Sequence, residues 1–208
     1  MLVMAAASLS VTTMRSLDRA DELALIERAR RRDFDAFGRL VDAYQHRVFG
    51  FAKRFVKDRE EAADITQEVF VRAFQNFDRF DARAPLRTWL FRIAYNLCVD
   101  KARRHERQPI EYRIDGNVEG EEPIDVMDDR WNPETMVLDD ELLQLVETGI
   151  ANMSEKLRSV LLLHDREDLQ YDEIAEVLNV PIGTVKSRLF LARAHLKQVL
   201  SEYLEAKR

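Results

Sequence analysis

The sequence predicts an all-α protein with two small helical domains joined by an acidic, flexible linker. Glycine and proline, which interrupt helices, number only six and five in 208 residues. Hydrophobic residues make up 46% of the chain and recur at helical spacing along most of it. One stretch breaks this pattern with clustered acids, prolines and glycines. We therefore expect a disordered N-terminal extension at residues 1–17, helical domains at 18–105 and 139–204, and a linker at 106–138.

The composition also limits the possible classes of protein. Charged residues make up 34% of the chain and no apolar run approaches membrane-spanning length, so we expect no membrane insertion. The apolar residues 1–13 lack the basic flank that a signal peptide requires. A single cysteine, Cys98, excludes an internal disulfide and fits a reducing compartment, which predicts a cytoplasmic location. The four histidines show no ligand spacing, and we expect no metal and no cofactor.

The first domain begins with two capped helices. Asp18 or Asp21 caps a short helix that ends in an arginine run at Arg32. Asp33 caps a long helix that continues to about Lys57. The apolar residues of this second helix follow helical spacing and form the predicted core: Phe37, Leu40, Val41, Tyr44, Val48, Phe51, Ala52 and Phe55.

The next helix, residues 60–77, carries two contrasting stripes. Its predicted buried stripe consists of Ala62, Thr66, Val69, Ala73 and Phe77. The opposite stripe places an exposed valine among carboxylates and amides: Asp64, Glu68, Val71 and Gln75. Such a face suits docking to another protein, although composition alone favours an ordinary solvated surface.

A loop at residues 79–85 precedes a helix, residues 86–104, that is apolar on almost every side. One stripe of this helix consists of Leu86, Leu90, Ile93 and Leu97. A second stripe carries Arg92, Asn96 and Arg103, with Trp89 beside it. An aromatic ring, an amide and guanidinium groups in this arrangement can stack on exposed bases and hydrogen-bond to them. A core tryptophan beside a basic helix end explains the same residues equally well.

The predicted linker is strongly acidic. From Glu106 to Asp140 the chain has twelve acidic residues and three arginines, a net charge of −9, with three prolines and two glycines among them. Mutual repulsion extends such a segment. Its charge keeps it away from DNA but allows it to lie in a basic channel.

The second domain contains a helix-turn-helix pattern at residues 171–199. Helices at 139–153 and 154–164 precede it, and Ser154 is placed to cap the second of them. The first helix of the pattern covers about 171–178, with Ile174, Ala175 and Leu178 facing inward. In the turn, Asn179 tolerates the left-handed conformation, and Pro181 suits the first position of the following helix.

The last helix, from about Pro181 to Leu200, has no acidic residue at all. Its core stripe consists of Val185, Leu189, Ala192, Leu196 and Val199, and a separate stripe consists of Lys186, Phe190, Arg193 and Lys197. Because only cations flank this exposed face, it suits a polyanion, and the N-terminal end of the helix can enter a major groove. The alternative is an ordinary surface helix with a solvated basic face.

Three sequence blocks together resemble the σ70 family of bacterial sigma factors, in its extracytoplasmic-function (group IV) subfamily. DITQEVFVRAF at residues 64–74 resembles the helix that docks on core RNA polymerase. LRTWLFRIAYNLCVDKARR at residues 86–104 resembles the helix that recognises the −10 promoter element. YDEIAEVLNVPIGTVKSRLFLARAHL at residues 171–196 resembles the reader of the −35 element. The resemblance assigns residues 18–105 to sigma region 2 and residues 139–204 to sigma region 4.

The resemblance, together with the exposed positions above, implies three sets of contacts. The expected core polymerase contacts are Asp64, Gln67, Glu68, Val71 and Arg72. The expected −10 contacts are Phe80, Arg83, Arg87, Trp89, Arg92, Asn96 and Arg103, and the loop 80–85 is expected to capture a flipped base. The expected −35 contacts are Thr184, Lys186, Ser187, Arg188, Phe190, Arg193 and Lys197. No residue is expected to be catalytic.

The implied function is initiation of transcription from a specific, stress-responsive set of promoters. The implied partners are the RNA polymerase core enzyme, promoter DNA and an anti-sigma factor. With a net charge of −6, the chain should bind promoter DNA weakly unless the polymerase supplies further phosphate contacts. Leu86 and Leu191 depart from the family pattern, where an aromatic and a basic residue are common.

Two other classes of protein are compatible with parts of the sequence. A self-sufficient repressor or activator with this helix-turn-helix would bind its operator tightly without polymerase. A metal-dependent nuclease or phosphatase would use the linker carboxylates, but these lie on a proline-broken segment without a histidine nearby. Adding core polymerase and promoter DNA to the purified protein separates the three possibilities.

Overall fold

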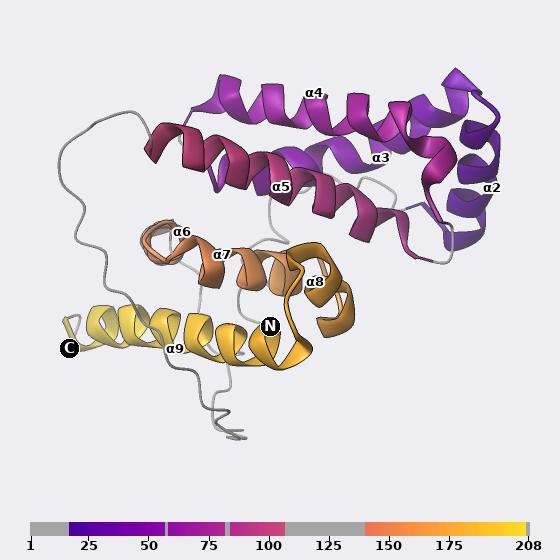
Figure 1. Cartoon of the computed structure of the whole chain (residues 1–208). Coiled ribbons are helices and arrows are strands. Elements are labelled where there is room, and N and C mark those ends of the chain that lie inside the picture. The colour runs from indigo at the N-terminus through magenta and orange to yellow at the C-terminus, as the bar shows by residue number, and fades with distance from the viewer. Residues whose placement is uncertain (1–16, 57, 82–83, 107–139, 207–208) are drawn as a thin grey trace. The chain divides into compact units, whose positions relative to one another are not determined.

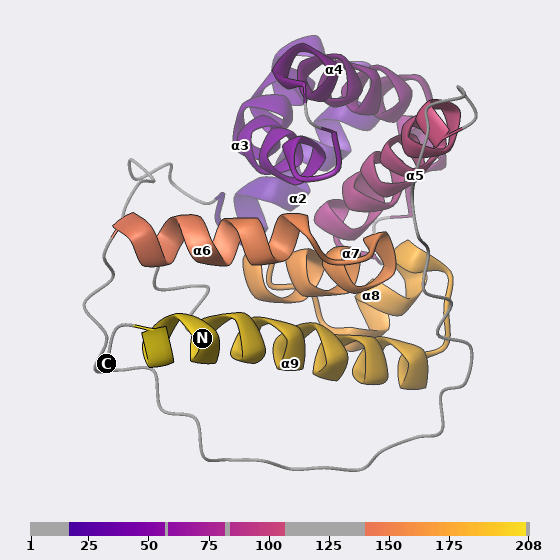
Figure 2. The same ribbon diagram turned by 90° about the vertical axis from the view of Figure 1, so that its left-hand side faces the viewer.

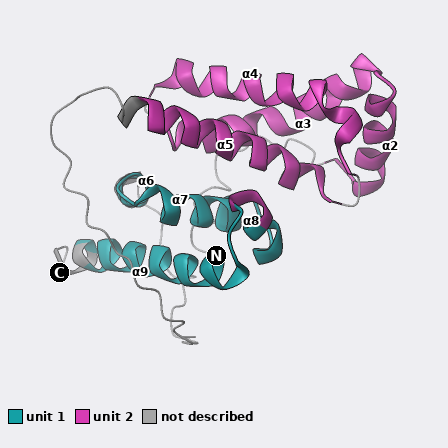
Figure 3. Ribbon diagram, viewed as in Figure 1, with its two compact units in different colours: residues 1–11, 112–175, 179–208 teal, residues 12–111, 176–178 magenta. Residues whose placement is uncertain are grey.

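The computed structural model describes residues 17–56, 58–81, 84–106 and 140–206 (Figure 1). Within these ranges every regular element is a helix, which confirms the all-α prediction. The chain divides into two compact units, one within residues 12–111 together with 176–178, and one within residues 112–175 and 179–208 (Figure 3). We call them the N-terminal unit and the C-terminal unit. Most of the expected extension (residues 1–17) and of the expected linker (residues 106–138) lies outside the described residues, and Glu106, expected to begin the linker, is instead helical.

The N-terminal unit is built from helices α2 (Arg19–Arg30), α3 (Phe34–Lys53), α4 (Arg59–Gln75) and α5 (Leu86–Glu106), with a short 3-10 helix η1 (Phe77–Arg79) after α4. Helix α3 packs against α2, α4 and α5 (Figure 2). Aspartates begin the first three helices. Asp18 accepts a hydrogen bond from the N–H of Ala20 at 3.3 Å, Asp33 from Ala36 at 3.0 Å, and Asp58 from Glu60 at 3.0 Å.

Helix α3 is shorter than predicted. It ends at Lys53 instead of continuing to about Lys57. The N–H groups of Arg54 and Phe55 turn back to the carbonyls of Phe51 and Ala52, at 3.1 and 2.9 Å, and so tighten the last turn. Sequence periodicity could not locate this end, because Phe55 and the buried Val56 continue the apolar pattern past it.

The core of the N-terminal unit lies where α3, α4 and α5 meet. Phe51 and Phe91 are fully buried there, with ring centroids 5.4 Å apart in an edge-to-face arrangement. Of the predicted α3 core, Leu40, Val48, Phe51 and Ala52 are buried, while Phe37, Val41, Tyr44 and Phe55 are half-buried. Cys98 is buried in α5, as its apolar setting predicted.

The C-terminal unit contains α6 (Asp140–Ala151), α7 (Glu155–Leu161), a π-helical turn η2 (Leu162–Arg166), most of α8 (Tyr171–Leu178) and α9 (Ile182–Ala206). The last three residues of α8, 176–178, are grouped with the N-terminal unit. Helix α9 packs along α6 and α7 (Figure 2). Gly149 allows a close approach there, because a Cβ atom added to it would lie 3.2 Å from Leu196. Arg158 closes the end of α6 by donating to the carbonyls of Ile150, Ala151 and Met153 at 3.1, 2.7 and 2.7 Å.

Three local predictions for the C-terminal unit need correction. The single helix predicted at residues 154–164 is instead α-helical only to Leu161 and continues as the π turn. Pro181 precedes α9 instead of occupying its first position, since its carbonyl accepts the N–H groups of Thr184 and Val185. Helix α9 also continues six residues past the predicted end at Leu200, to Ala206.

The turn between α8 and α9 confirms the role predicted for Asn179. Helix α8 covers Tyr171–Leu178 as predicted, and Asn179 follows with φ 53° and ψ 50°, in the left-handed region. Its N–H bonds back to the Ala175 carbonyl and so closes the helix. The position therefore needs a residue that tolerates positive φ.

Replacing Asn179 with valine is expected to lower the free energy of unfolding of the C-terminal unit by about 1–2 kcal/mol, because a β-branched residue is strained at positive φ. Asn179→Gly is the matched control and should stay within about 0.5 kcal/mol of the parent. Native-state hydrogen exchange of the α9 amides, which reports on the C-terminal unit alone, measures both variants. Equal stability of the two variants would show that the turn relaxes out of the left-handed region.

Candidate functional site

The exposed face of α4 carries the residues predicted to contact polymerase. Asp64, Gln67, Val71 and Arg72 are exposed and Glu68 is half-buried. Arg72 Nε donates to Glu68 Oε1 at 2.7 Å, so these two predicted contacts already form an ion pair one helical turn apart. An exposed pair of this kind contributes little to stability. Its members can therefore change partners at low cost when another protein docks.

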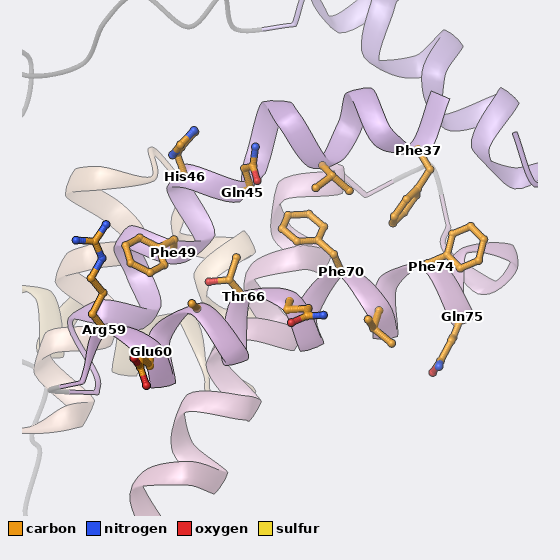
Figure 4. A pocket seen from close by; sticks show the side chains of 14 residues that line it. Phe37, Gln45, His46, Phe49, Arg59, Glu60, Thr66, Phe70, Phe74 and Gln75 are labelled. Atoms are coloured by element: carbon orange, nitrogen blue, oxygen red, sulfur yellow. The ribbon is translucent and has the colours of Figure 1, made fainter. Parts of the chain in front are cut away.

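A groove between α3 and α4 extends this face (Figure 4). Its volume is about 990 Å³, and side chains of the two helices line it from opposite sides. The α4 side includes the predicted contacts Gln67 and Val71. The α3 side was not predicted to be functional and consists of Phe37, Val41, Gln45, His46 and Phe49. One signal was present in the sequence, since Phe49 is an aromatic residue outside the predicted core stripe of α3.

Exposed aromatic surface continues beyond one end of the groove. Phe34 is 72% exposed and stacks on Phe74, a groove residue, with ring centroids 5.4 Å apart. The guanidinium of Arg32 also lies over the Phe74 ring, with its Cζ 5.3 Å from the ring centroid. Contiguous exposed apolar surface is characteristic of a protein interface.

The residues predicted to face the −10 element lie along α5. Arg92, Asn96 and Arg103 are exposed, while Trp89 and Arg87 are half-buried. The indole of Trp89 lies against Phe80 and Phe77, with ring centroids 5.1 and 5.9 Å away. Two buried rings thus pack against Trp89, and part of its own side chain remains exposed.

Phe80 is placed differently from a residue that stacks on a base. Only 2% of its surface is exposed, because it packs under Trp89, and Arg30 of α2 donates to its backbone carbonyl. In this structure Phe80 therefore supports Trp89, and direct contact with DNA would require its ring to leave the core. Arg83, also predicted to contact the −10 element, lies outside the described residues. Leu86 is buried, so its departure from the family pattern acts through packing.

Helix α9 separates its apolar and basic residues as predicted. Val185, Leu189, Ala192 and Leu196 are buried, and Val199 is half-buried. Lys186, Phe190 and Lys197 are exposed, and Thr184, Ser187 and Arg188 are half-buried near the start of the helix. Ser187 Oγ donates to the carbonyls of Gly183 and Thr184, both at 3.2 Å. Leu191, where the family often has a basic residue, is exposed.

Among the residues that the structure describes, Arg193 is the predicted −35 contact that forms an ion pair within its own unit. Its Nη2 donates to Asp165 Oδ1 at 2.8 Å. Asp165 lies in the π turn, is 6% exposed, and also contacts His164 Nδ1 at 2.7 Å. Burial alone would raise the pKa of Asp165, but the bonds from His164 and Arg193 outweigh it and hold the pKa below the ordinary value. Nothing in the local sequence pattern pointed to Asp165.

No helix in the described residues has both the length and the apolarity to cross a membrane.

Family models match most of the two described units. The model of Sigma-70 region 2 matches residues 40–108, and the model of Sigma-70, region 4 matches residues 143–196. These matches contain α4 and α5 in the first case, and α8 and most of α9 in the second.

Relatives that match most of the chain are also sigma factors. The ECF RNA polymerase sigma factor SigW of Bacillus subtilis is 35% identical over 181 residues, which cover 85% of this chain and 95% of the relative. The ECF RNA polymerase sigma-E factor of Escherichia coli K12 is 35% identical over 170 residues, which cover 81% of this chain and 88% of the relative.

Solved structures match the fold. CnrH, solved in complex with the cytosolic domain of CnrY, gives a TM-score of 0.62 at 25% identity, over 88% of this chain and 98% of that one. The sigma factor RpoE of Bartonella quintana, solved with the anti-sigma factor NepR, gives a TM-score of 0.61 at 22% identity, over 79% and 96% of the two chains. The second likeness concerns the fold alone.

Proposed function

Since the chain belongs to the σ70 family of RNA polymerase sigma factors, in its extracytoplasmic-function group, we propose how its described surfaces divide the work of transcription initiation. The chain is an initiation factor that binds core polymerase and recognises promoters. In our proposal α4 and the adjoining groove bind the core enzyme, α5 binds the −10 element, and α9 binds the −35 element.

The observation that carries the proposal is that α9 buries its apolar residues on one side and exposes its basic residues on the other. Lys186 and Lys197 are exposed on a helix whose opposite side is buried, and residues 181–200 contain no carboxylate. A helical segment whose charged residues are all cations attracts phosphates, which supply affinity but no sequence information. The half-buried Thr184, Ser187 and Arg188 lie at the end of the helix that would enter the major groove and read bases.

The −10 element is bound, in this proposal, by the surface around Trp89. A tryptophan supported from beneath by Phe77 and Phe80 presents a rigid aromatic surface on which an unpaired base can stack. The exposed Arg92 and Asn96 are placed on the same helix to contact phosphate and base edges. Stacking on melted bases stabilises the open promoter, and no residue performs covalent chemistry.

The polymerase-binding surface combines the polar residues of α4 with the groove. The groove supplies apolar area that can be buried on binding. Asp64, Glu68 and Arg72, on the part of α4 that borders α5, supply charges that fix the orientation of the partner. The sigma factor RpoE of Bartonella quintana, which shares this fold, has been solved with the anti-sigma factor NepR, and by analogy we propose that an anti-sigma factor controls this chain. Because RNA polymerase acts in the cytoplasm, we also propose a cytoplasmic location for the chain.

The test is reconstitution with core RNA polymerase on a promoter fragment. The fragment is taken upstream of a transcript start that rises when this chain is overexpressed, and we call it the mapped promoter. Specific transcription requires both the chain and core polymerase. Tight, specific binding of the chain alone to the mapped promoter would instead favour a self-sufficient repressor or activator.

Lys186→Ala is expected to weaken binding of the reconstituted holoenzyme to the mapped promoter and to reduce the slope of log affinity against log salt by about 1, because one phosphate contact is lost. Lys156→Ala, an exposed lysine of α7, is the control and should leave the slope unchanged. Titration of the fluorescence anisotropy of labelled promoter at several salt concentrations measures both. An equal change in both variants would show that α9 has no special contact with DNA.

A further inference from the structure

Three polar side chains of the C-terminal unit meet at one carboxylate oxygen. Asp165 Oδ1 lies 2.8 Å from Arg193 Nη2 and 2.7 Å from His164 Nδ1, and these two nitrogens are 3.3 Å apart. The imidazole of His164 also packs on the Tyr171 ring, with centroids 5.2 Å apart. The contacts join η2 and α8 to the middle of α9, although Asp165 and Arg193 are 28 positions apart.

The π turn brings Asp165 to this position. The N–H of Glu167 bonds to the Leu162 carbonyl at 3.2 Å, five residues earlier, where an α-helix would bond four residues earlier. Such a turn contains one more residue than an α-helical turn, which rotates the following side chains by about 100° relative to a continuous helix. π turns are uncommon and occur frequently at functional sites.

Burial makes the Asp165 carboxylate dependent on its partners. With 6% of its side chain exposed, it has little water to solvate its charge, and a buried charge is costly unless it is hydrogen-bonded. Arg193 is in the opposite situation, since 48% of its side chain is exposed. The guanidinium is therefore anchored at its Nη2 end to a fixed carboxylate, while much of the side chain remains open to a ligand.

We propose that Asp165 is a positioning residue that holds the Arg193 guanidinium in the orientation in which it binds a backbone phosphate at the −35 element. The inference rests on the proposed role of α9 as the −35 reader. A flexible arginine loses side-chain entropy when it binds a phosphate, and an anchored one has already lost part of it. The planar fork of arginine permits this double use, because one edge bonds Asp165 and the other remains for the phosphate.

The proposal is tested with the holoenzyme on the mapped promoter, using Asp165→Asn, Arg193→Ala and the double variant. Asparagine keeps the size of Asp165 but removes its charge. Arg193→Ala is expected to weaken binding about tenfold, because one charge-assisted hydrogen bond is lost. It should also reduce the slope of log affinity against log salt by about 1. Asp165→Asn should produce most of the same loss, and the double variant should bind no more weakly than Arg193→Ala alone.

The double variant distinguishes positioning from a purely structural role. If Asp165→Asn acted only by destabilising the C-terminal unit, its loss would persist in the Arg193→Ala background, and the two losses would multiply. Unchanged or tighter binding by Asp165→Asn would also overturn the proposal, because Asp165 would then only neutralise Arg193. Thermal unfolding of each variant, followed by circular dichroism, confirms that the binding measurements are made on folded protein.

Lys186→Ala separates failure of this inference from failure of the proposed function. If Lys186→Ala and Arg193→Ala weaken binding while Asp165→Asn does not, positioning is refuted and the role of α9 stands. If neither Lys186→Ala nor Arg193→Ala changes the affinity or the salt slope, α9 is not the −35 reader and the positioning inference falls with it.

Discussion

Phe91→Ala is expected to lower the free energy of unfolding of the N-terminal unit by about 3–5 kcal/mol, the usual cost of removing a fully buried phenyl ring. Phe91 has no exposed surface and packs edge to face on Phe51, so alanine leaves a cavity that the surrounding helices cannot fill. A loss of this size is a large part of the roughly 5–15 kcal/mol that stabilises a typical domain. We therefore expect much of the variant to be unfolded at physiological temperature.

The measurement needs a probe that reports on this unit alone. The chain has two tryptophans, Trp89 and Trp131, so Trp131→Phe leaves Trp89 as the single tryptophan beside the core. Urea unfolding followed by its fluorescence then gives the free energy for the N-terminal unit. Phe34→Ala is the matched control, because the same ring is removed from a 72% exposed position and only its stacking on Phe74 is lost, about 0.5–1.5 kcal/mol. Similar losses in both variants would place Phe91 outside the cooperative core.

Features that depend on near neighbours in the sequence could be predicted. The capping aspartates Asp33 and Asp58 act on N–H groups two or three residues away, and Asn179 closes a turn within its own helix. Asp33 and Asn179 were predicted, whereas Asp58 was not. Spacing on a single helix likewise predicted which side of α9 is buried, because the period of an α-helix is fixed by its backbone.

Features that depend on distant contacts could not be predicted. Phe80 was expected at a base-binding loop, but it is buried under Trp89 and held by Arg30, 50 positions earlier. No periodic pattern within one helix contains that information. The same reason applies to the partnership of Asp165 and Arg193, and to the π turn that brings the two residues together.

The groove could not be predicted from the residue spacing of either helix alone. A groove belongs to two helices, and its α3 residues Phe37 and Val41 have the spacing of ordinary core residues. From this spacing, both residues were predicted only to be buried in the core. The structure shows that they are only half-buried, so the apolar surface that remains open on α3 is available to a partner that also contacts α4.

The largest expected effect on function comes from a substitution in this groove. Val71→Asp should weaken binding of the chain to core RNA polymerase by about 30-fold or more, the range of a hot-spot residue, because it places a charge where apolar surface is buried on docking. Val71 is 41% exposed at the margin of the groove, next to the Glu68–Arg72 ion pair. Because the side chain is already exposed, the fold should tolerate aspartate.

Leu23→Asp provides the control for this variant. Leu23 lies on α2 of the same unit and is 43% exposed, so the substitution makes a similar chemical change at similar exposure but outside the groove. Competition of each unlabelled variant with labelled parent protein for core polymerase gives the two affinities directly. We expect Leu23→Asp to stay within about threefold of the parent, as for a residue outside a hot spot. If both variants lose the same affinity, exposed apolar surface anywhere on the unit matters equally, and α4 with its groove is not the docking site.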